Sequence, residues 1–417
     1  MTGSGLAGPT GGTADIAVIG GGIIGTAIAY ELARDGASVV LFDKGPLANG
    51  TTGGSGGVVC LHDFHQLYAG FTALGYDRIR ELSRTHDIGY RPWGFLAIDH
   101  GEPFTPVDDP YAREFDSGTP DSIYHRLEIG APDLFSRYEW LRPGEISGAV
   151  LYPNQGYIHP YRITQTYARM AVATGRAEIH DGTPVLSMRS VGHRLTRLVT
   201  RRGTWDVGAV VNAGGPWGAK VAALAGVELA LVPQRVQVAV ITTFDDGIDG
   251  IPLTGVPERV AGENVWTRGE LGGTTLVGTH HDRTRDGLTV DPDFLNRMPD
   301  AGYPAAVDEV FRRHWNLDRS EVLPGWCCVY GTTEDGFPIV SRDPDVENLW
   351  HAVGLNGHGI TCHAGVAQAI AGMVLRNTTI VDTSMIGGAT TSIDVAPLAA
   401  DRFVRGEQLV IRYPGEH

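Results

Sequence analysis

Residues 15–43 read DIAVIGGGIIGTAIAYELARDGASVVLFD, and this stretch decides the fold of the N-terminal part of the chain. Its first apolar residues predict a short buried strand, and a helical pattern begins after a glycine-rich turn. The turn has the spacing G-x-G-x-x-G, formed by Gly20, Gly22 and Gly25. A second apolar strand, residues 38–42, ends directly before Asp43. Strand, turn, helix, strand and acid in this order predict a dinucleotide-binding unit.

Each of these residues meets a physical need of such a unit. Gly20 permits the tight turn, Gly22 lets a pyrophosphate approach the backbone, and Gly25 lets the helix pack close to the strand. The helix N-terminus presents N–H groups and a partial positive charge to the phosphates. Asp43 can accept hydrogen bonds from a ribose 2′-OH and would repel a 2′-phosphate. The glycines alone would also fit a tight turn that binds nothing.

The bulk composition is that of a soluble globular protein and excludes several classes of partner. The chain has 417 residues, 42% hydrophobic and 19% charged, enough for two or three domains. A net charge of −15 argues against nucleic acids and anionic membrane surfaces. Neither a signal-peptide pattern nor an apolar run of about 18 residues occurs, so we expect a cytoplasmic protein without a membrane span. The four cysteines lack C-x-x-C spacing, which argues against a zinc site or a disulfide framework.

The pattern of strands and helices divides the chain into two interleaved domains. Residues 86–150 and 227–326 predict an inserted antiparallel-sheet domain for a substrate. Residues 1–13 form a tail of small residues that we expect to be disordered. The rest predicts an α/β domain for the cofactor, Rossmann-like and of the glutathione-reductase type, formed by residues 14–85, 151–226 and 327–403.

Three further glycine-rich segments fit a bound cofactor. Residues 49–59, NGTTGGSGGVV, can place many N–H groups around its inner half, although a flexible surface linker would have the same composition. The turn AVVNAGGPWG, residues 209–218, follows a buried strand and belongs at the carboxyl edge of a parallel sheet, where ligands bind. The loop GLNGHG, residues 354–359, precedes a helix and repeats the anion-binding arrangement of the N-terminus.

FAD is the dinucleotide that these segments favour. A flavin gains negative charge near N1 and the C2 carbonyl when it is reduced, and the helix after the GLNGHG loop can stabilise that charge. No second G-x-G-x-x-G lies between a predicted strand and a predicted helix, as a nicotinamide nucleotide would require. We therefore predict one bound dinucleotide, FAD in preference to NAD.

Several stretches together resemble the D-amino-acid oxidase superfamily of FAD-dependent amine oxidoreductases, and within it the glycine oxidase and monomeric sarcosine oxidase branch. They span nearly the whole chain in the expected order and read GGGIIGTAIAYELARDGASVVLFDKG, VVNAGGPWG, TTEDGFPIV, GLNGHGITCHAG and DVAPLAADRF. The resemblance implies an enzyme that oxidises the C–N bond of an amine or amino-acid-like substrate to an imine by hydride transfer to flavin N5. Oxygen or an electron carrier would then accept the electrons.

One segment resembles the sarcosine oxidase branch in particular, which has a C-x-Y-x-x-T-x-D pattern near the flavin. Cys328, Tyr330, Thr333 and Asp335 have this spacing. The resemblance implies a thioether between the cysteine and the flavin 8α carbon, and a tyrosine that lines the substrate pocket. A thiolate beside the flavin methyl can react, whereas a cysteine in the core stays inert. Cys327 is adjacent, so either thiol could simply pack as a small apolar group.

The chain departs from that branch at positions where the resemblance implies positive charge. Leu276 occupies the place of a lysine that assists oxygen reduction, so we expect an electron carrier to be preferred to oxygen. Gly57, Cys60 and Thr361 replace basic residues that hold a substrate carboxylate. The sequence therefore argues against a simple N-methyl amino acid bound in the manner of the branch.

The histidines have more than one interpretation. His280 lies on a predicted strand of the substrate sheet, where it could act in catalysis or serve as a hydrogen-bonded structural residue. His358 is expected to shape the flavin loop. His62 and His65 follow the glycine-rich segment and could face the ring or the solvent.

Two alternative functions follow from the same residues. A 2-hydroxy-acid dehydrogenase on this fold would need His280 as a base and an arginine clamp, Arg91 or Arg268. The chain could also be a subunit that carries FAD without catalysis. We predict His280 and Tyr330 as catalytic residues. The predicted cofactor-binding residues are Gly20, Gly22, Ile23, Ile24, Gly25, Asp43, Lys44, Thr51, Thr52, Ser55, Gly56, Gly57, Val58, Ala213, Gly214, Trp217, Cys328, Asp335, Gly354, Asn356, Gly357, His358, Gly359 and Ile360.

Overall fold

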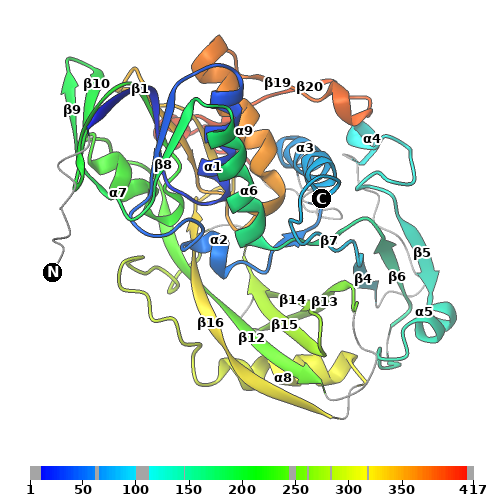
Figure 1. Cartoon of the computed structure of the whole chain (residues 1–417). Coiled ribbons are helices and arrows are strands. Elements are labelled where there is room, and N and C mark those ends of the chain that lie inside the picture. Colours follow the sequence, from blue (N-terminus) through cyan, green and yellow to red (C-terminus); the bar gives the residue numbers. More distant parts are fainter. Residues whose placement is uncertain are drawn as a thin grey trace, which may run out of the picture.

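The computed structural model of the chain describes residues 11–61, 65–99, 112–144, 146–243, 250–260, 263–281, 284–316 and 319–410. Within these ranges the chain forms two large sheets, one in the upper and one in the lower part of Figure 1, with helices packed on both. His62 and residues 1–10 of the predicted tail lie outside the described residues. No helix in the described ranges is both long and apolar enough to cross a membrane.

The first sheet contains the predicted dinucleotide-binding unit. Its strands are β1 (Gly12–Ile19), β2 (Val39–Phe42), β8 (Ala177–His180), β9 (Val185–Val191), β10 (Arg194–Thr200), β11 (Gly203–Asn212), β17 (Ile339–Arg342) and β18 (Leu349–Val353). Their order is β17-β18-β11-β1-β2-β8, and the β9–β10 hairpin extends β11. The pairs from β18 to β8 are all parallel. The carboxyl ends of these strands therefore meet at one edge, where a ligand can bind.

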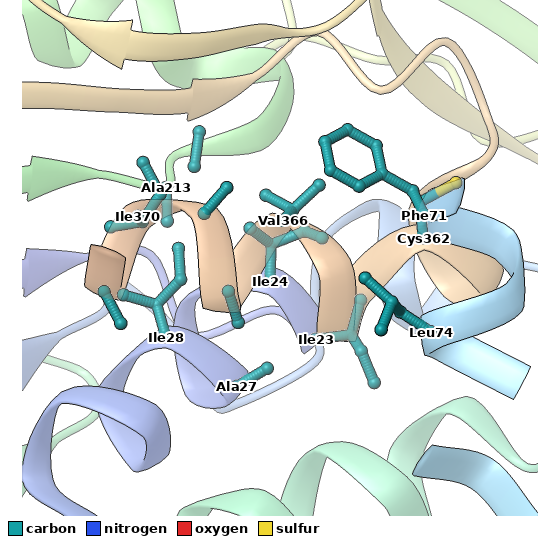
Figure 2. Close-up of a cluster of buried hydrophobic side chains, with 14 of the residues drawn as sticks. Ile23, Ile24, Ala27, Ile28, Phe71, Leu74, Ala213, Cys362, Val366 and Ile370 are labelled. Carbon is teal, nitrogen blue, oxygen red and sulfur yellow. The ribbon is translucent and has the colours of Figure 1, made fainter. Parts of the chain in front are cut away.

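Helices cover one face of this sheet and bury its apolar side chains. They are α1 (Ile23–Arg34), α3 (Gln66–Ser83), α6 (Pro160–Ala173) and α9 (Gly359–Arg376). Figure 2 shows side chains of α1, α3 and α9 in one buried cluster, among them Ile24, Leu74 and Val366. On the opposite face the β9–β10 hairpin and α7 (Gly218–Ala223) pack on the sheet. Because α1 and α9 are packed within this cluster, their N-termini are held at fixed positions at the ligand edge.

The second sheet carries the predicted substrate domain. Its strands are β4 (Phe95–Asp99), β5 (Leu127–Gly130), β6 (Gly148–Tyr152), β12 (Val232–Thr243), β13 (Leu253–Val260), β14 (Glu263–Gly269), β15 (Thr274–His280) and β16 (Ser320–Thr332), in the order β16-β12-β15-β14-β13-β4-β6-β5. One face packs on α8 (Tyr303–His314), and α5 (Ala131–Arg137) packs near β5 and β6. The prediction of an antiparallel sheet is corrected at one place, since β13 and β4 are parallel. They can be parallel because a long stretch of chain connects them.

Short elements connect and close the two sheets. They are α2 (Thr51–Gly54), β3 (Val58–Val59), α4 (Ala112–Phe115), β7 (Gly156–Tyr157), β19 (Ile380–Asp382), β20 (Ser392–Asp394), α10 (Arg402–Arg405) and the 3₁₀ turns at Gly215–Trp217, Ser384–Ile386 and Ala396–Leu398. β3 and β7 pair with each other and tie the glycine-rich segment to the chain that leads into α6.

The predicted fold class is confirmed, and the predicted boundaries differ in detail. β1 begins at Gly12, inside the predicted tail, because its first residues pair with β11. The boundaries after Val150 and Trp326 fall within β6 and β16. β16 begins in the second sheet and ends beside the ligand edge of the first, so this one strand serves both domains.

Candidate functional site

A cavity lies at the carboxyl edge of the first sheet. It encloses about 880 Å³ of empty space, counting its open mouth. The predicted cofactor residues that line it are Gly20, Gly22, Ile23, Ile24, Asp43, Thr51, Thr52, Ser55, Ala213, Gly214, Trp217, Gly354, Asn356, Gly357, Gly359 and Ile360. The predicted catalytic residue Tyr330 also lines it. Four segments far apart in the sequence are thus brought to one place.

The first turn has the geometry that its spacing predicts. Gly20 has φ +123, and a Cβ built there would lie 2.2 Å from the carbonyl oxygen of Ala213. A Cβ on Gly25 would lie 1.8 Å from the carbonyl oxygen of Gly20, so only glycine allows the helix this close. A Cβ on Gly22 would meet only Thr52, at 3.0 Å from its Oγ1. Gly22 lines the cavity, so it leaves free the space that a side chain would fill.

Two helix N-termini are directed at this cavity. Among the described residues, His358 makes no side-chain cap bond at the start of α9, and at the start of α1 the Ile23 N–H donates a 3.2 Å bond to Thr52 Oγ1. The first-turn residues Ile23, Ile24, Gly359 and Ile360 line the cavity. An elongated anionic ligand fits this arrangement, since both helix ends carry partial positive charge. The residues present therefore fit a dinucleotide.

Asp43 lies at the end of β2, as predicted. Its Oδ2 accepts a 2.6 Å hydrogen bond from the Gly21 N–H and its Oδ1 a 2.8 Å bond from the Gly45 N–H. Burial raises the pKa of Asp43, although these bonds act in the opposite direction. A carboxylate has about four lone-pair sites, so two donors leave capacity for a ribose hydroxyl.

Several predicted cofactor residues lie outside the cavity lining and support its wall. Lys44 binds Asp293 and stacks on Trp217. Gly57 has φ +66, and its backbone carbonyl accepts a bond from Ile158, while Val58 pairs with Tyr157 in the β3–β7 ribbon. These residues fix the glycine-rich segment in place. The further predicted residues outside the lining are Gly25, Gly56, Cys328, Asp335 and His358, and the catalytic candidate His280.

Asp335, which was predicted as a cofactor contact, binds groups of the protein itself. Its Oδ2 accepts a 2.7 Å bond from Nε of Arg402, and its Oδ1 accepts bonds from another Arg402 nitrogen and from the Phe337 N–H. The Arg402 and Asp335 side chains are 0% and 1% exposed. A buried bidentate pair of this kind occupies the carboxylate. Arg402 belongs to the closing segment DVAPLAADRF. Its ion pair with Asp335 therefore anchors this segment to the TTEDGFPIV turn.

Cys328 lies behind α2 and outside the cavity lining. A Cβ built on Gly54 would lie 2.7 Å from Cβ and 3.5 Å from Sγ of Cys328. Burial raises the pKa of the Cys328 thiol to about 12. The adjacent Cys327 points to the other side of β16, toward Gln237. The thiol of Cys328 is therefore neutral at pH 7 without a cofactor beside it.

Aromatic and histidine side chains gather around Gly357 at the inner end of the cavity. His280 Nδ1 lies 3.4 Å from the Tyr330 hydroxyl, and the His280 and His358 rings are 4.9 Å apart. The Tyr68 ring lies 5.1 Å from His358. A Cβ on Gly357 would lie 2.7 Å from both the His280 and Tyr330 rings. His280 and Tyr330, the two predicted catalytic residues, are thus brought together beside the loop that leads into α9.

A buried arginine of the second sheet lies against the glycine-rich segment at residues 49–59. Arg268 is 4% exposed, donates to the carbonyl oxygen of Gly56 and forms an ion pair with Glu270. Its guanidinium stands 4.3 Å from the centre of the Tyr157 ring, and Nε has no hydrogen-bond partner among the described residues. Burial lowers the pKa of Arg268 to about 10, so it stays positive at neutral pH. Arg91, the other candidate clamp, donates to the carbonyl oxygen of Tyr90.

Sequence reasoning missed several cavity residues that stand beside predicted ones. They are Gly21, Gly50, Gly215, Pro216, Gly331, Ala352 and Leu355. Most belong to the glycine-rich segments, and taking each segment whole would have found them. Gly331 and Ala352 carry no local signal, since they reach the cavity only through the positions of β16 and β18.

Comparisons with known proteins place this site in a family. Residues 15–373 match the DAO family model, described as FAD dependent oxidoreductase. The chain is 25% identical over 385 residues to the glycine oxidase of Geobacillus kaustophilus, covering 88% of this chain and 94% of that one. It is 26% identical over 383 residues to the monomeric sarcosine oxidase of Bacillus sp. NS-129, covering 89% and 95%.

Solved structures share the fold at lower identity. L-proline dehydrogenase from P. horikoshii superposes with a TM-score of 0.79 at 20% identity, covering 96% of this chain and all (100%) of that one. Glycine oxidase from Geobacillus kaustophilus superposes with a TM-score of 0.68 at 22% identity, covering 94% and 99%. The two-sheet architecture is therefore that of known flavoenzymes.

Proposed function

Since the chain belongs to the DAO family of FAD-dependent oxidoreductases, we propose that it oxidises the C–N bond of an amine or amino-acid-like substrate to an imine. The matched relatives named glycine oxidase and monomeric sarcosine oxidase support this substrate class. The observation that carries the proposal is the contact of His280 with Tyr330, which lines the cavity, together with a buried guanidinium, that of Arg268, bound to Gly56 of the glycine-rich segment.

The cavity wall would hold the cofactor through backbone groups. FAD, when bound, supplies the N5 atom that accepts the hydride of the substrate. The first turn and the N-terminus of α1 would hold its pyrophosphate, and Asp43 its adenosine ribose. The N-terminus of α9 would stabilise the negative charge of the reduced ring. The protein thus provides binding, orientation and electrostatic stabilisation.

We propose that His280 and Tyr330 control the proton on the substrate amine. An ammonium cannot release a hydride from its neighbouring carbon easily, so the amine has to bind neutral. His280 Nδ1 and the Tyr330 hydroxyl are 3.4 Å apart and can accept that proton between them. The rings packed around Gly357 would strengthen this interaction by limiting the access of water.

Arg268 is the residue that we propose to bind an anionic group of the substrate. Its guanidinium is buried beside Gly56, the neighbour of the cavity residue Ser55. Its Nε has no hydrogen-bond partner within the described residues, and its present counterion, Glu270, is 37% exposed and can be displaced. Arginine binds carboxylates with two parallel hydrogen bonds. Arg268 would then supply, from the second sheet, the charge that Gly57 and Cys60 lack.

The same arrangement favours one alternative, oxidation of a 2-hydroxy acid. Arg268 could hold the acid and His280 could accept the hydroxyl proton. An amine would lose its proton from nitrogen and a 2-hydroxy acid from oxygen. Titrating the flavoprotein with compounds of each class separates the two functions.

Anaerobic titration of the purified flavoprotein tests these possibilities. We expect amino acids or N-alkyl amino acids to bleach the flavin absorbance and 2-hydroxy acids to leave it unchanged. Bleaching by hydroxy acids alone would favour the alternative, and no bleaching by either class would favour a flavin-carrying subunit. Arg268→Met should lower kcat/KM about 100-fold for a substrate with a carboxylate, and much less for the same amine without it. Arg268→Lys and Arg91→Met serve as matched controls.

A further inference from the structure

The chain has only two lysines, Lys44 and Lys220, and both bind the same aspartate, Asp293. We propose that Asp293 is a positioning residue for the adenosine end of FAD, because it fixes Lys44 and Trp217 at the wall of the cavity. The proposal rests on FAD binding alone and is independent of which substrate the enzyme oxidises.

The Asp293 carboxylate accepts hydrogen bonds from three side-chain donors. Its Oδ1 accepts a 2.5 Å bond from Lys44 Nζ and a 2.7 Å bond from the Trp217 indole N–H. Its Oδ2 accepts a 2.5 Å bond from Lys220 Nζ, which also binds Asp291 at 2.6 Å. The bonds from Lys220 and Lys44 hold the pKa of Asp293 well below its usual range. The carboxylate therefore stays ionised at neutral pH.

The contacts of Asp293 lie at the adenosine end of the cavity. Lys44 directly follows Asp43, the acid placed for the adenosine ribose, and its ammonium stands 4.0 Å from the centre of the Trp217 ring. Trp217 lines the cavity, and a Cβ on Gly50 of the glycine-rich segment would lie 3.3 Å from its ring. The orientation of the Trp217 ring is thus set from one side by Lys44 and at its indole nitrogen by Asp293.

Asp293 itself belongs to a segment that is fastened to the second sheet. The Val290 N–H donates to the carbonyl oxygen of Pro233, and the Arg235 N–H donates to that of Leu288. Farther along, Asp300 binds Arg235 at 2.9 Å. The aspartate therefore connects the second sheet to the cofactor wall of the first. A single exposed ion pair contributes little to stability. One carboxylate that binds three side chains, however, restricts the conformations of all three.

Asp293→Asn separates this positioning role from simple electrostatics, since the two predict opposite changes in the rate of FAD release. Removing the carboxylate leaves two ammonium groups near a diphosphate, so charge alone would slow the release of FAD. If positioning dominates, FAD should leave the holoprotein about three to ten times faster in a Cys328→Ser background, where no thioether can retain it, as measured by the recovery of flavin fluorescence on dilution. Asp293→Glu should restore most of the retention. Asp206→Asn, which removes the remote exposed pair with Arg197, should change nothing.

The binding of two fragments of FAD, ADP and FMN, shows which end of the cofactor the substitution affects. Asp293→Asn should weaken the binding of ADP to the apoprotein and leave that of FMN unchanged, because FMN lacks the adenosine moiety. Thermal unfolding of the apoprotein should shift no more than in Asp206→Asn. Unchanged or slower FAD release, or equal weakening of ADP and FMN, would overturn the proposal.

Discussion

The two sheets contribute to the same cavity with different chemical groups. From the first sheet come backbone turns and helix N-termini, at Gly20, Gly22 and the loop before α9. From the second come side chains: Tyr330 lines the cavity, His280 contacts Tyr330, and Arg268 contacts Gly56 of the glycine-rich segment. Backbone recognition needs glycine at fixed spacings, and so it is visible in the sequence. Side-chain recognition depends on which strands pair. Many different sequences allow the same pairing, so this kind of recognition is not visible in the sequence.

The register of the second sheet explains how its site forms. Arg268 pairs with Leu276, and Trp266 pairs with Gly278. Paired residues in an antiparallel sheet point to the same face, so Leu276 and His280 share the face of Arg268 and Trp266. The lack of a side chain at Gly278 makes room for the Trp266 ring, since a Cβ there would lie 2.2 Å from it. Leu276 therefore lies on the cofactor-facing side, where the resemblance to sarcosine oxidases implies a lysine.

The largest effect is expected from substitutions in the first glycine-rich turn, where backbone groups line the cavity. Gly25→Val should abolish FAD binding and also lower the unfolding temperature of the apoprotein, because its Cβ would lie 1.8 Å from the Gly20 carbonyl oxygen. Gly22→Val should abolish FAD binding with little change in apoprotein stability, since only Thr52 is near. Flavin content and thermal unfolding of both variants measure this. Normal flavin content in both would contradict the assignment of the turn.

An intermediate effect concerns Cys328, which lies on β16 behind α2. A thioether to FAD requires the thiolate, and burial raises the pKa of Cys328 to about 12. Below that pH the thiolate fraction rises about tenfold per unit, so attachment during reconstitution should be about 100 times faster at pH 9 than at pH 7. Acid precipitation followed by absorbance of the pellet measures attachment.

The cysteine variants decide which thiol is used. Cys328→Ser should release all flavin on acid treatment, whereas Cys327→Ser should keep it in the pellet. If the wild-type protein loses its flavin after incubation at either pH, Cys328 is only a packing residue.

The smallest effect is expected from substitutions of Leu276, a side chain of the second sheet. We expect slow reoxidation of the dithionite-reduced protein by oxygen, because Leu276 offers no positive charge to stabilise superoxide. Leu276→Lys should speed reoxidation about tenfold in stopped-flow measurements, and Leu276→Met should not. Rapid reoxidation of the wild-type protein, unaffected by His280→Ala, would show that another group activates oxygen or that none is needed.

Local sequence patterns were sufficient to predict the cofactor-binding half of this protein. The strand at Leu349–Val353, the helix after GLNGHG and the first turn were all predictable, because apolar periodicity and glycine spacing are local properties of the chain. The identity of the wall residues followed from the same segments. The missed residues are mostly neighbours of predicted ones, such as Gly21 and Gly50, whereas Ala352 reaches the cavity only through the position of β18.

The tertiary structure alone decided the partners of the charged residues. Asp335 was predicted at the cofactor and instead binds Arg402, 67 residues away in sequence. Arg268 meets Gly56 across 212 residues, and Lys44 meets Asp293 across 249. No local pattern encodes such pairs, since a charged side chain has the same sequence signature whether it is solvated or paired. Which of the two occurs depends on burial and on the register of strands, which are set only when both sheets have formed.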